Sequence, residues 1–489
     1  MGFTRKSILL LGASFLAFAA VMGNSDAEAA SANTWQGGTT GNWFTTSSWT
    51  DGVPSSGETI IIGGGPSLVR AGIGTGRGET GDILLKDRGN LSVSLDGMLD
   101  ATGTVTVGYD ATSENLDSTF LVYSGGTATV DGLLVGSTNA DAGENTVSVT
   151  GNGSKLTVSG ATNYQFTIGG ANAATLEIGS GAVVNAGAAG DRQVQIGTGT
   201  PGEGGVLSIG RGGASGTLNA SGVYLASSDS SVVFDHTDNV TFDTVITGSG
   251  SVTKDGSGTL TLTGANTYSG GTFFNDGIVS VSQDSNLGNP AGALTFNGGT
   301  LQFGAAFDPN SMRAITLQAG GGTIDTNGND VKIVRTISGT GSFTKTGEGT
   351  LTLSGMNNFT GETIISQGTL ALENQGRLQS SSLVTVNGTL DISAASSAAL
   401  KALTGSGRII LGDAGLRIDG GINVFSGIIS GNGGLSIMGG TQTFTGENTF
   451  LGATSVGANS QLRIGDGGTT GSITGNIGNY GSVNGSDIY

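Results

Sequence analysis

Short alternating runs, separated by turn-forming residues, make up this chain from about residue 30 to its end. Residues 104–107, 127–130 and 259–263 are examples, with Leu, Val or Ala alternating with Thr. A period of two places the apolar side chains on one face of a β-strand and the hydroxyls on the other. The 93 glycines supply the positive-φ corners that sharp turns between such strands need. This pattern predicts an all-β fold of many short strands.

The regular recurrence of the runs indicates how the strands are arranged. They return about every 8 to 13 residues, and no change of texture marks off a separate globular domain. At roughly 20–25 residues per coil and ~4.8 Å between coils, this predicts a right-handed parallel β-helix, a rod of about 20 coils. One segment departs from the pattern: residues 394–403 (AASSAALKAL) favour a short helix.

The first 29 residues have the features of a cleavable Sec signal peptide. Arg5 and Lys6 precede an apolar stretch at residues 7–21, and an Ala-x-Ala site ends at Ala29. This stretch is shorter than the about 20 apolar residues that a transmembrane helix needs. We therefore expect cleavage after Ala29, with an uncleaved anchor as the alternative. No second apolar run of membrane length follows in the sequence.

Composition excludes several kinds of site. The chain has no Cys and one His, which rules out disulfides, thiol nucleophiles, Cys-based zinc sites and sites built from several imidazoles. Its net charge is −18 and it has no basic run, which argues against nucleic acid and anionic membrane surfaces as partners. We predict no catalytic residue, no cofactor and no metal site.

A long internal repeat supports the solenoid. Residues 246–281 align without a gap with residues 337–372, with 17 identities over 36 positions, and a third copy at 429–464 needs one gap. The matched positions are glycines that suit corners and alternating leucines that suit a core. Each copy also has a turn Asn, which we expect to bond the backbone of its own corner. These are Asn266, Asn357 and Asn448.

The first two copies resemble the autotransporter-associated β-strand repeat, whose pattern is GxGxLxKxGxGTLTLxGxNxYxGxTxxxxGTL. Residues 146–178 are similar to a shorter repeat of the same class of exported proteins. Ile437 stands where the other two copies have Lys254 and Lys345, so the third copy is degenerate. The chain therefore resembles the passenger of a type V autotransporter.

The patterns divide the chain into four predicted segments. They are a signal peptide at 1–29, a solenoid cap at 30–65, a β-helix with short degenerate repeats at 66–245, and a β-helix with the long repeats at 246–489. The last residues resemble the approach to a further repeat, so we expect a truncated passenger. The resemblance implies a C-terminal membrane β-barrel beyond this chain as its link to the outer membrane. The alternative is a stand-alone secreted rod.

Two polar clusters are candidates for chemistry. His236 lies between Asp235 and Asp238, but neighbours in a strand face opposite sides, and no nucleophilic Ser motif occurs. We interpret it as structural or exposed. Residues 325–330 (DTNGND) resemble the first half of a Ca²⁺ loop, but Asp330 stands where Gly is required and Thr336 where Glu is required. A solvated Asx turn is the better interpretation.

The remaining candidates are aromatic or basic. Trp35, Trp43 and Trp49 are the three Trp residues of the protein. They suit a cap that closes the first coil of the solenoid, and sugar stacking is the alternative. We interpret Lys254 and Lys345 as exposed, solubilising charges on edge positions. The acidic residues are scattered, with no distinctive pair.

The resemblance implies a non-catalytic, surface-exposed autotransporter passenger that serves adhesion, aggregation or colonisation. A host surface, a glycan or a second copy would be its partner. As written, the chain would reach the periplasm through Sec, and the full-length protein the cell surface. The alternatives are a β-helix enzyme acting on polysaccharide, which would need charged side chains converging in one groove, and a purely structural envelope or matrix protein.

Overall fold

The computed structural model describes residues 33–36, 41–63, 69–73, 76–86, 88–95, 97–108, 117–136, 143–160, 166–171, 174–187, 190–467, 470–479 and 481–485. The chain divides into two compact units, Met1–Gly271 and Thr272–Tyr489, and each is described by itself. The predicted signal peptide lies outside the described residues.

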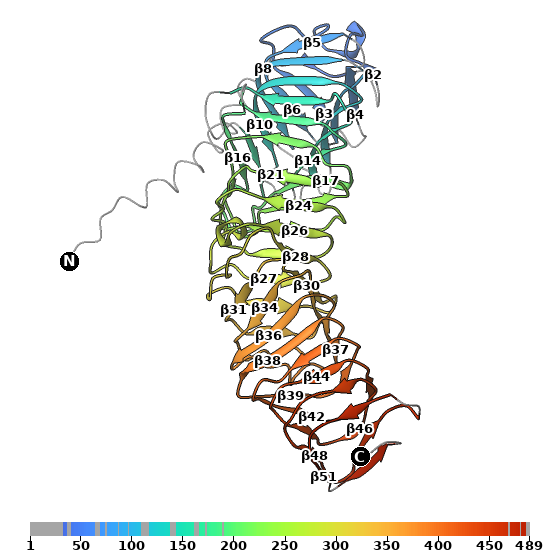
Figure 1. The fold of residues 1–489 in the computed structure, drawn as a ribbon. Helices are drawn as coiled ribbons and strands as arrows, with labels where there is room; N and C mark the ends of the chain where they lie inside the picture. The colour runs from blue at the N-terminus through green and yellow to red at the C-terminus, as the bar shows by residue number, and fades with distance from the viewer. Residues whose placement is uncertain are drawn as a thin grey trace, which may run out of the picture. The chain divides into compact units, whose positions relative to one another are not determined.

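In the first unit, strands of successive coils pair in parallel and form two long sheets (Figure 1). The first sheet contains β1 (Asn33–Thr34), β3 (Ile60–Gly63), β6 (Ile83–Lys86), β8 (Met98–Val107), β10 (Thr127–Val135), β13 (Phe166–Ile168), β16 (Gln193–Ile196), β19 (Gly222–Leu225) and β22 (Ile246–Gly248). The second contains β2 (Gly41–Asn42), β4 (Val69–Ile73), β7 (Gly89–Val93), β9 (Ser118–Tyr123), β11 (Asn145–Thr150), β14 (Ala174–Gly179), β17 (Val206–Gly213), β20 (Ser231–His236) and β23 (Ser251–Lys254).

Shorter rows complete the first unit. They are β5 (Arg77–Thr80), which pairs with β8; the row β12 (Lys155–Val158), β15 (Val183–Ala186) and β18 (Thr217–Asn219); and the pair β21 (Val240–Phe242) and β24 (Thr259–Leu262).

The strands of the second unit also pair in parallel and form six rows. One row is β25 (Thr272–Phe274), β27 (Leu294–Phe296), β29 (Ile315–Leu317) and β32 (Ile337–Gly339). A second is β26 (Ile278–Val281), β28 (Thr300–Phe303), β30 (Gly322–Asp325), β33 (Phe343–Thr346), β35 (Thr363–Ile365), β37 (Val384–Val386) and β40 (Leu403–Thr404). A third is β31 (Val331–Ile333), β34 (Thr350–Leu353), β36 (Thr369–Asn374), β38 (Thr389–Ala395), β41 (Arg408–Ile410) and β44 (Ile428–Ser430).

The last coils form the other three rows. They are β39 (Ser397–Leu400), β42 (Gly415–Ile418), β45 (Leu435–Ile437), β48 (Thr454–Val456) and β51 (Ile477–Asn479); β43 (Ile422–Phe425), β46 (Gly440–Phe444), β49 (Ser460–Ile464) and β52 (Ser482–Gly485); and β47 (Glu447–Asn448) with β50 (Ser472–Ile473).

The register of the strands pairs residues of the same type in neighbouring coils. Leu351 pairs with Leu370, and Leu370 pairs with Leu390, so one leucine column crosses three coils. Because each strand pairs with a strand one coil away, and in parallel, the topology is that of a β-solenoid. The predicted all-β parallel β-helix is confirmed.

The interior follows the sequence alternation. In β24, Leu260 and Leu262 are buried while Thr261 between them is half-buried, and Leu351 and Leu353 of β34 repeat this arrangement. Phe274 and Phe296 occupy paired positions and stack with ring centroids 4.4 Å apart. The core of each unit is therefore a set of apolar columns along the coil axis.

The predicted helix at residues 394–403 is wrong. The segment lies in β38, β39 and β40. Ala398 pairs with Leu416 and Leu400 pairs with Ile418, and Ala398 and Leu400 are both buried. Alternate Ala and Leu positions satisfy the apolar columns, and this tertiary pairing overrides the helix propensity of Ala and Leu. The described helices are two single 3₁₀ turns, η2 (Thr46–Ser48) and η3 (Asp284–Leu287).

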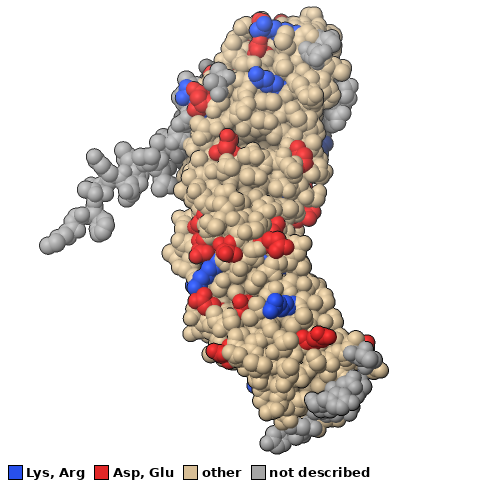
Figure 2. Space-filling view, in the orientation of Figure 1, with Lys and Arg blue, Asp and Glu red and all other residues tan. Residues whose placement is uncertain are grey.

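Over the described ranges, no helix has the length and apolar character needed to cross a membrane. Acidic and basic side chains are scattered singly or in small groups over the face drawn in Figure 2.

The three Trp residues pack on one another. Trp49 lies edge-to-face against both Trp35 and Trp43, at 5.0 Å between ring centroids, and its Nε1 donates to the Trp43 carbonyl at 2.9 Å. Their exposures are 7%, 0% and 3% for Trp35, Trp43 and Trp49, which leaves no open ring face for a sugar. The solenoid cap at residues 30–65 stays a prediction.

Candidate functional site: the corners of the long repeats

Two long repeats use the same strand order. The copy at 337–372 contains β32, β33, β34, β35 and β36, and the copy at 246–281 contains β22, β23, β24, β25 and β26. In the third copy, β44, β45, β46, β48 and β49 occupy the matching positions, with the two-residue β47 between them. The repeats therefore supply equivalent corners, and these corners carry the buried polar groups.

A buried Asn ties each corner to the coil before it. The side-chain Oδ1 of Asn357 accepts the backbone N–H of Ile337 at 2.9 Å, 20 residues earlier. Asn266 does the same for Ile246 at 2.8 Å, and Asn448 for Ile429 at 3.0 Å. The predicted bond within the asparagine's own corner is present at Asn448, whose Nδ2 donates to the Gly446 carbonyl at 3.0 Å. The bond that all three copies share, to the coil before, was not predicted. Stacking places the corner of one coil over the corner of the coil before it, so the amide reaches along the stack.

Lys254 and Lys345 are buried, which corrects the prediction that they are exposed edge charges. Both side chains are fully inaccessible. Lys345 lies in an apolar column, paired with Ile324 on one side and Ile365 on the other. The alternation of the strand does contain the signal that was missed, because Lys345 lies two residues after the buried Phe343 and therefore on the same face.

The Lys345 ammonium is held by backbone carbonyls of the corner. Its Nζ donates to Gly347 at 2.7 Å, Thr346 at 2.8 Å and Gln367 at 3.2 Å. Lys254 donates to the carbonyl of Gly256, the residue equivalent to Gly347. Burial lowers the pKa of Lys345 to about 8, against the opposing effect of the Asp325 and Glu348 carboxylates.

Corner length explains why the third copy lacks this lysine. Four residues separate Lys345 from Thr350, whereas three residues separate Ile437 from Thr441. Ile437 is buried and pairs with Ile418 and Val456, so it continues an apolar column. We infer that the ammonium satisfies carbonyls that the longer corner turns inward, and that the shorter corner needs no such donor.

The lowered pKa of Lys345 predicts how the free energy of unfolding changes with pH. Because the pKa of Lys345 is about 8 when folded and 10.5 in its ordinary state, the unfolded chain binds more protons between these values. The free energy of unfolding should then rise with pH from about 8 toward 10.5, on the order of 1–2 kcal/mol more than in Lys345→Met. Denaturant unfolding of both proteins across this range measures the difference. Parallel pH curves would contradict the assignment.

His236 is buried and structural, which was one of the two interpretations of the sequence; the other was an exposed histidine. Its Nδ1 contacts the Asp238 carbonyl oxygen at 2.8 Å. Burial lowers the pKa of His236, and this hydrogen bond opposes that effect only in part. Its Nε2 has no hydrogen-bond partner, whereas a catalytic triad needs a Ser hydroxyl there. The Ser215 hydroxyl instead donates to Asp238 Oδ2 at 2.7 Å. This geometry does not activate a nucleophile.

Residues 325–330 form turns rather than a cation loop. Asp325 Oδ1 accepts the Asn327 N–H at 2.8 Å, and Asn327 has φ of 49°. The carboxylate of Asp330 accepts the Thr350 N–H of the next coil at 2.7 Å. The predicted Asx turn is therefore present. In the described ranges, no three His, Asp or Glu side chains gather as a metal site would require.

Chelation provides a direct check on these turns. Treatment with EDTA should leave the far-UV circular dichroism and the melting temperature unchanged, since the carboxylates of residues 325 and 330 already accept protein N–H groups. A fall in melting temperature that Ca²⁺ reverses would show that these turns hold a cation.

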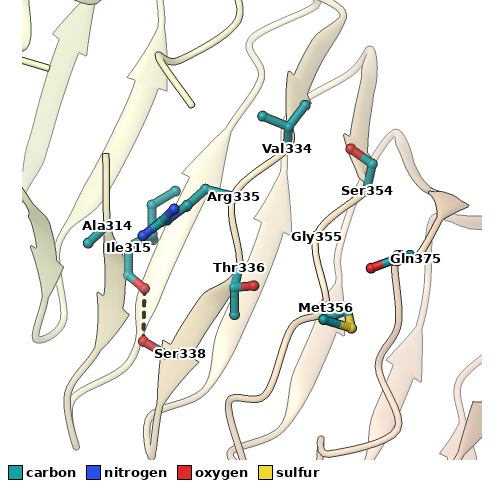
Figure 3. Close-up of a pocket in the computed structure, with 10 residues that line it drawn as sticks. All are labelled: Ala314, Ile315, Val334, Arg335, Thr336, Ser338, Ser354, Gly355, Met356 and Gln375. Carbon is teal, nitrogen blue, oxygen red and sulfur yellow. Dashed lines mark hydrogen bonds between the residues drawn. The ribbon is translucent and has the colours of Figure 1, made fainter. Parts of the chain in front are cut away.

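An open groove lies at the corner of the second repeat (Figure 3). Its volume is about 540 Å³, and its walls come from successive coils. The lining residues are Ala314, Ile315, Val334, Arg335, Thr336, Ser338, Ser354, Gly355, Met356 and Gln375. A second groove, of about 570 Å³, is lined by Ile422, Gly440, Thr441, Ala458, Asn459, Ser460, Gln461, Gly481 and Ser482. Neither lining includes a carboxylate.

Comparison with known proteins matches the repeats. The family described as passenger-associated-transport-repeat matches residues 252–281, 343–372 and 439–458, each within one predicted copy. The Adhesin BmaC autotransporter of Brucella suis biovar 1 (strain 1330) is 40% identical over 158 residues, which is 32% of this chain and 4% of that protein. The chain thus spans a small part of the length of this relative.

The fold and the corners define a parallel β-helix that carries passenger transport repeats. With these matches, the resemblance to an autotransporter passenger with repeats is confirmed.

Proposed function

We propose that this chain is a surface-exposed, non-catalytic part of an autotransporter passenger that presents its corners for adhesion. The observation that carries this proposal is the set of three passenger repeats in a chain similar to a protein named an adhesin. The partner is a host surface, a glycan or a second copy of the chain. Nucleic acid is not expected, because the net charge is −18.

Equivalent corners of the repeats support a display role. The glycine and the buried asparagine are kept in all three, as in Gly355 and Asn357 of the second copy. The exposed residue between them differs in each copy, being Ala265, Met356 or Glu447. A constant inner frame with variable outward side chains suits a scaffold that presents several surfaces.

The enzyme alternative has no support from the two grooves. Glycoside hydrolysis uses a pair of carboxylates beside the scissile bond. The groove of the second repeat offers one cation, hydroxyls, an amide and apolar groups. These groups can bind a ligand, but they include no general acid or base.

Adhesion can be tested on whole cells and on the exported chain. Cells that display residues 30–489 should adhere to host cells or to one another more than cells that display a shuffled-loop solenoid of equal length. The purified chain should bind the same targets and release no product from polysaccharide. Binding no stronger than that of the control would leave a purely structural role.

A further inference from the structure

We propose that the groove of the second repeat, with Arg335 as its anchor, binds an acidic saccharide of the uronate class. This deepens the proposed adhesive function and rests on it. The groove is composed of Arg335, the hydroxyls of Thr336, Ser338 and Ser354, the Gln375 amide, and the exposed apolar side chains of Val334 and Met356.

Arg335 supplies the charge. Its side chain is exposed, and within the described ranges no carboxylate lies at ion-pair distance from its guanidinium. Glu373, two residues before Gln375, is already engaged by Lys332 at 2.8 Å. A free guanidinium in a chain of net charge −18 is suited to a carboxylate, which it binds with two parallel hydrogen bonds.

The remaining lining suits a sugar ring. Figure 3 shows Arg335 on the side of Ala314, with Ser354, Met356 and Gln375 on the other side. Hydroxyl and amide groups both donate and accept, as sugar hydroxyls require of their partners. The Ser338 hydroxyl already donates to the Ile315 carbonyl at 3.3 Å, so it serves a ligand as an acceptor. Val334 and Met356 are 43% and 48% exposed and offer apolar contact to the C–H face of a ring. Arg335, Met356 and Gln375 lie on three successive coils about 4.8 Å apart, so together they can line more than one sugar unit of an oligosaccharide.

The backbone at this corner argues against an added peptide strand. The N–H of Ile337 is held by Asn357, that of Asn357 by the Gly355 carbonyl at 2.9 Å, and that of Ser354 by the Ile333 carbonyl at 3.0 Å. β-Strand addition needs a row of unpaired N–H and C=O groups, and these N–H groups are already bonded. Gly355 also packs closely on Arg335, because a Cβ at residue 355 would lie 2.6 Å from the Arg335 carbonyl.

The other two corners do not reproduce this chemistry. Thr244 and Gly427 stand at the positions equivalent to Arg335, and Ala265 and Glu447 at those equivalent to Met356. The acid-binding groove is therefore specific to the second repeat.

The test is binding of fluorescent oligogalacturonate to the exported chain, followed by fluorescence anisotropy. Arg335→Gln should weaken binding at least about tenfold. Arg408→Gln is the matched control, since Arg408 is exposed and lies outside the groove, and it should change the affinity by less than about twofold. Circular dichroism should show both variants folded.

Four further results would overturn the proposal. Equal weakening by the two substitutions would indicate general electrostatic attraction, and equal binding of the carboxyl-reduced oligosaccharide would remove the role of the acid. Equally tight, Arg335-dependent binding of oligoglutamate would assign the groove to an acidic peptide instead. Cells displaying Arg335→Gln that adhere as well as the parent would refute the groove as the adhesive site while leaving the adhesive function intact.

Discussion

Leu262→Asp is expected to lower the free energy of unfolding by more than about 3 kcal/mol. Leu262 is 1% exposed and pairs with Phe242 of the neighbouring coil, so the new carboxylate would enter an apolar column without a partner. Leu353→Asp, at the equivalent position of the second repeat, should have a similar effect because Leu353 is also buried. Chemical denaturation followed by circular dichroism measures both.

The matched control is Thr261→Asp in the same strand. Thr261 is half-buried on the outward side and pairs with Thr241, so the added charge can stay in water. The expected loss is under about 1 kcal/mol. Equal losses at positions 261 and 262 would contradict the strand register.

The fold could be predicted because its signals are local and repeated. Alternation of Leu and Thr in β24 and β34 sets which side chains enter the core, and the glycines of the repeats mark the corners. The same reasoning failed for residues 394–403, where Ala398 is compatible with both a helix and a strand. Pairing with Leu416 of the next coil decides that case, and a local pattern does not contain it.

The corners were harder to predict because their partners lie about one coil away. Asn357 was recognised as a turn residue, but its bond to Ile337, 20 residues earlier, depends on how the coils stack. Lys345 is a charged residue at a core-facing position, and its carbonyl partners exist only in the folded corner. Sequence reasoning therefore identified the turn residues of the corner, but it did not find the buried hydrogen bonds that they make.

The groove of the second repeat was not predicted. Arg335, Met356 and Gln375 are single outward residues in separate corners. Arg335 and Gln375 lie outside the repeat copy at 337–372, and Met356 occupies its variable position. Their spacing of about one coil was the one signal that could have brought them together. This spacing can be used only when the number of residues in each coil is known. Insertions in the corners change that number from coil to coil, so the sequence alone did not align these residues.

Arg313→Met should destabilise the second unit by about 3–5 kcal/mol, because it breaks a buried ion pair from one side. Arg313 is 0% exposed. Its Nε donates to Asp284 Oδ1 of η3 at 2.7 Å, and its Nη2 donates to Asp284 Oδ2 at 3.1 Å. The guanidinium also donates to five backbone carbonyls of the preceding coil. These belong to Asp284, Leu287, Gly288, Asn289 and Gly292.

The planar guanidinium of Arg313 thus holds the loop around η3 in place. A methionine at this position would leave these oxygen acceptors without their hydrogen-bond donor. Arg313→Lys keeps the charge but has a single donor group, so it should recover only part of the loss. Arg408→Met, at an exposed arginine of the same unit, should change the free energy of unfolding by less than about 0.5 kcal/mol. Chemical denaturation gives these values, and limited proteolysis should show new cleavage at residues 284–292 in Arg313→Met. Equal stability of the variants at positions 313 and 408 would mean that the loop folds without its arginine.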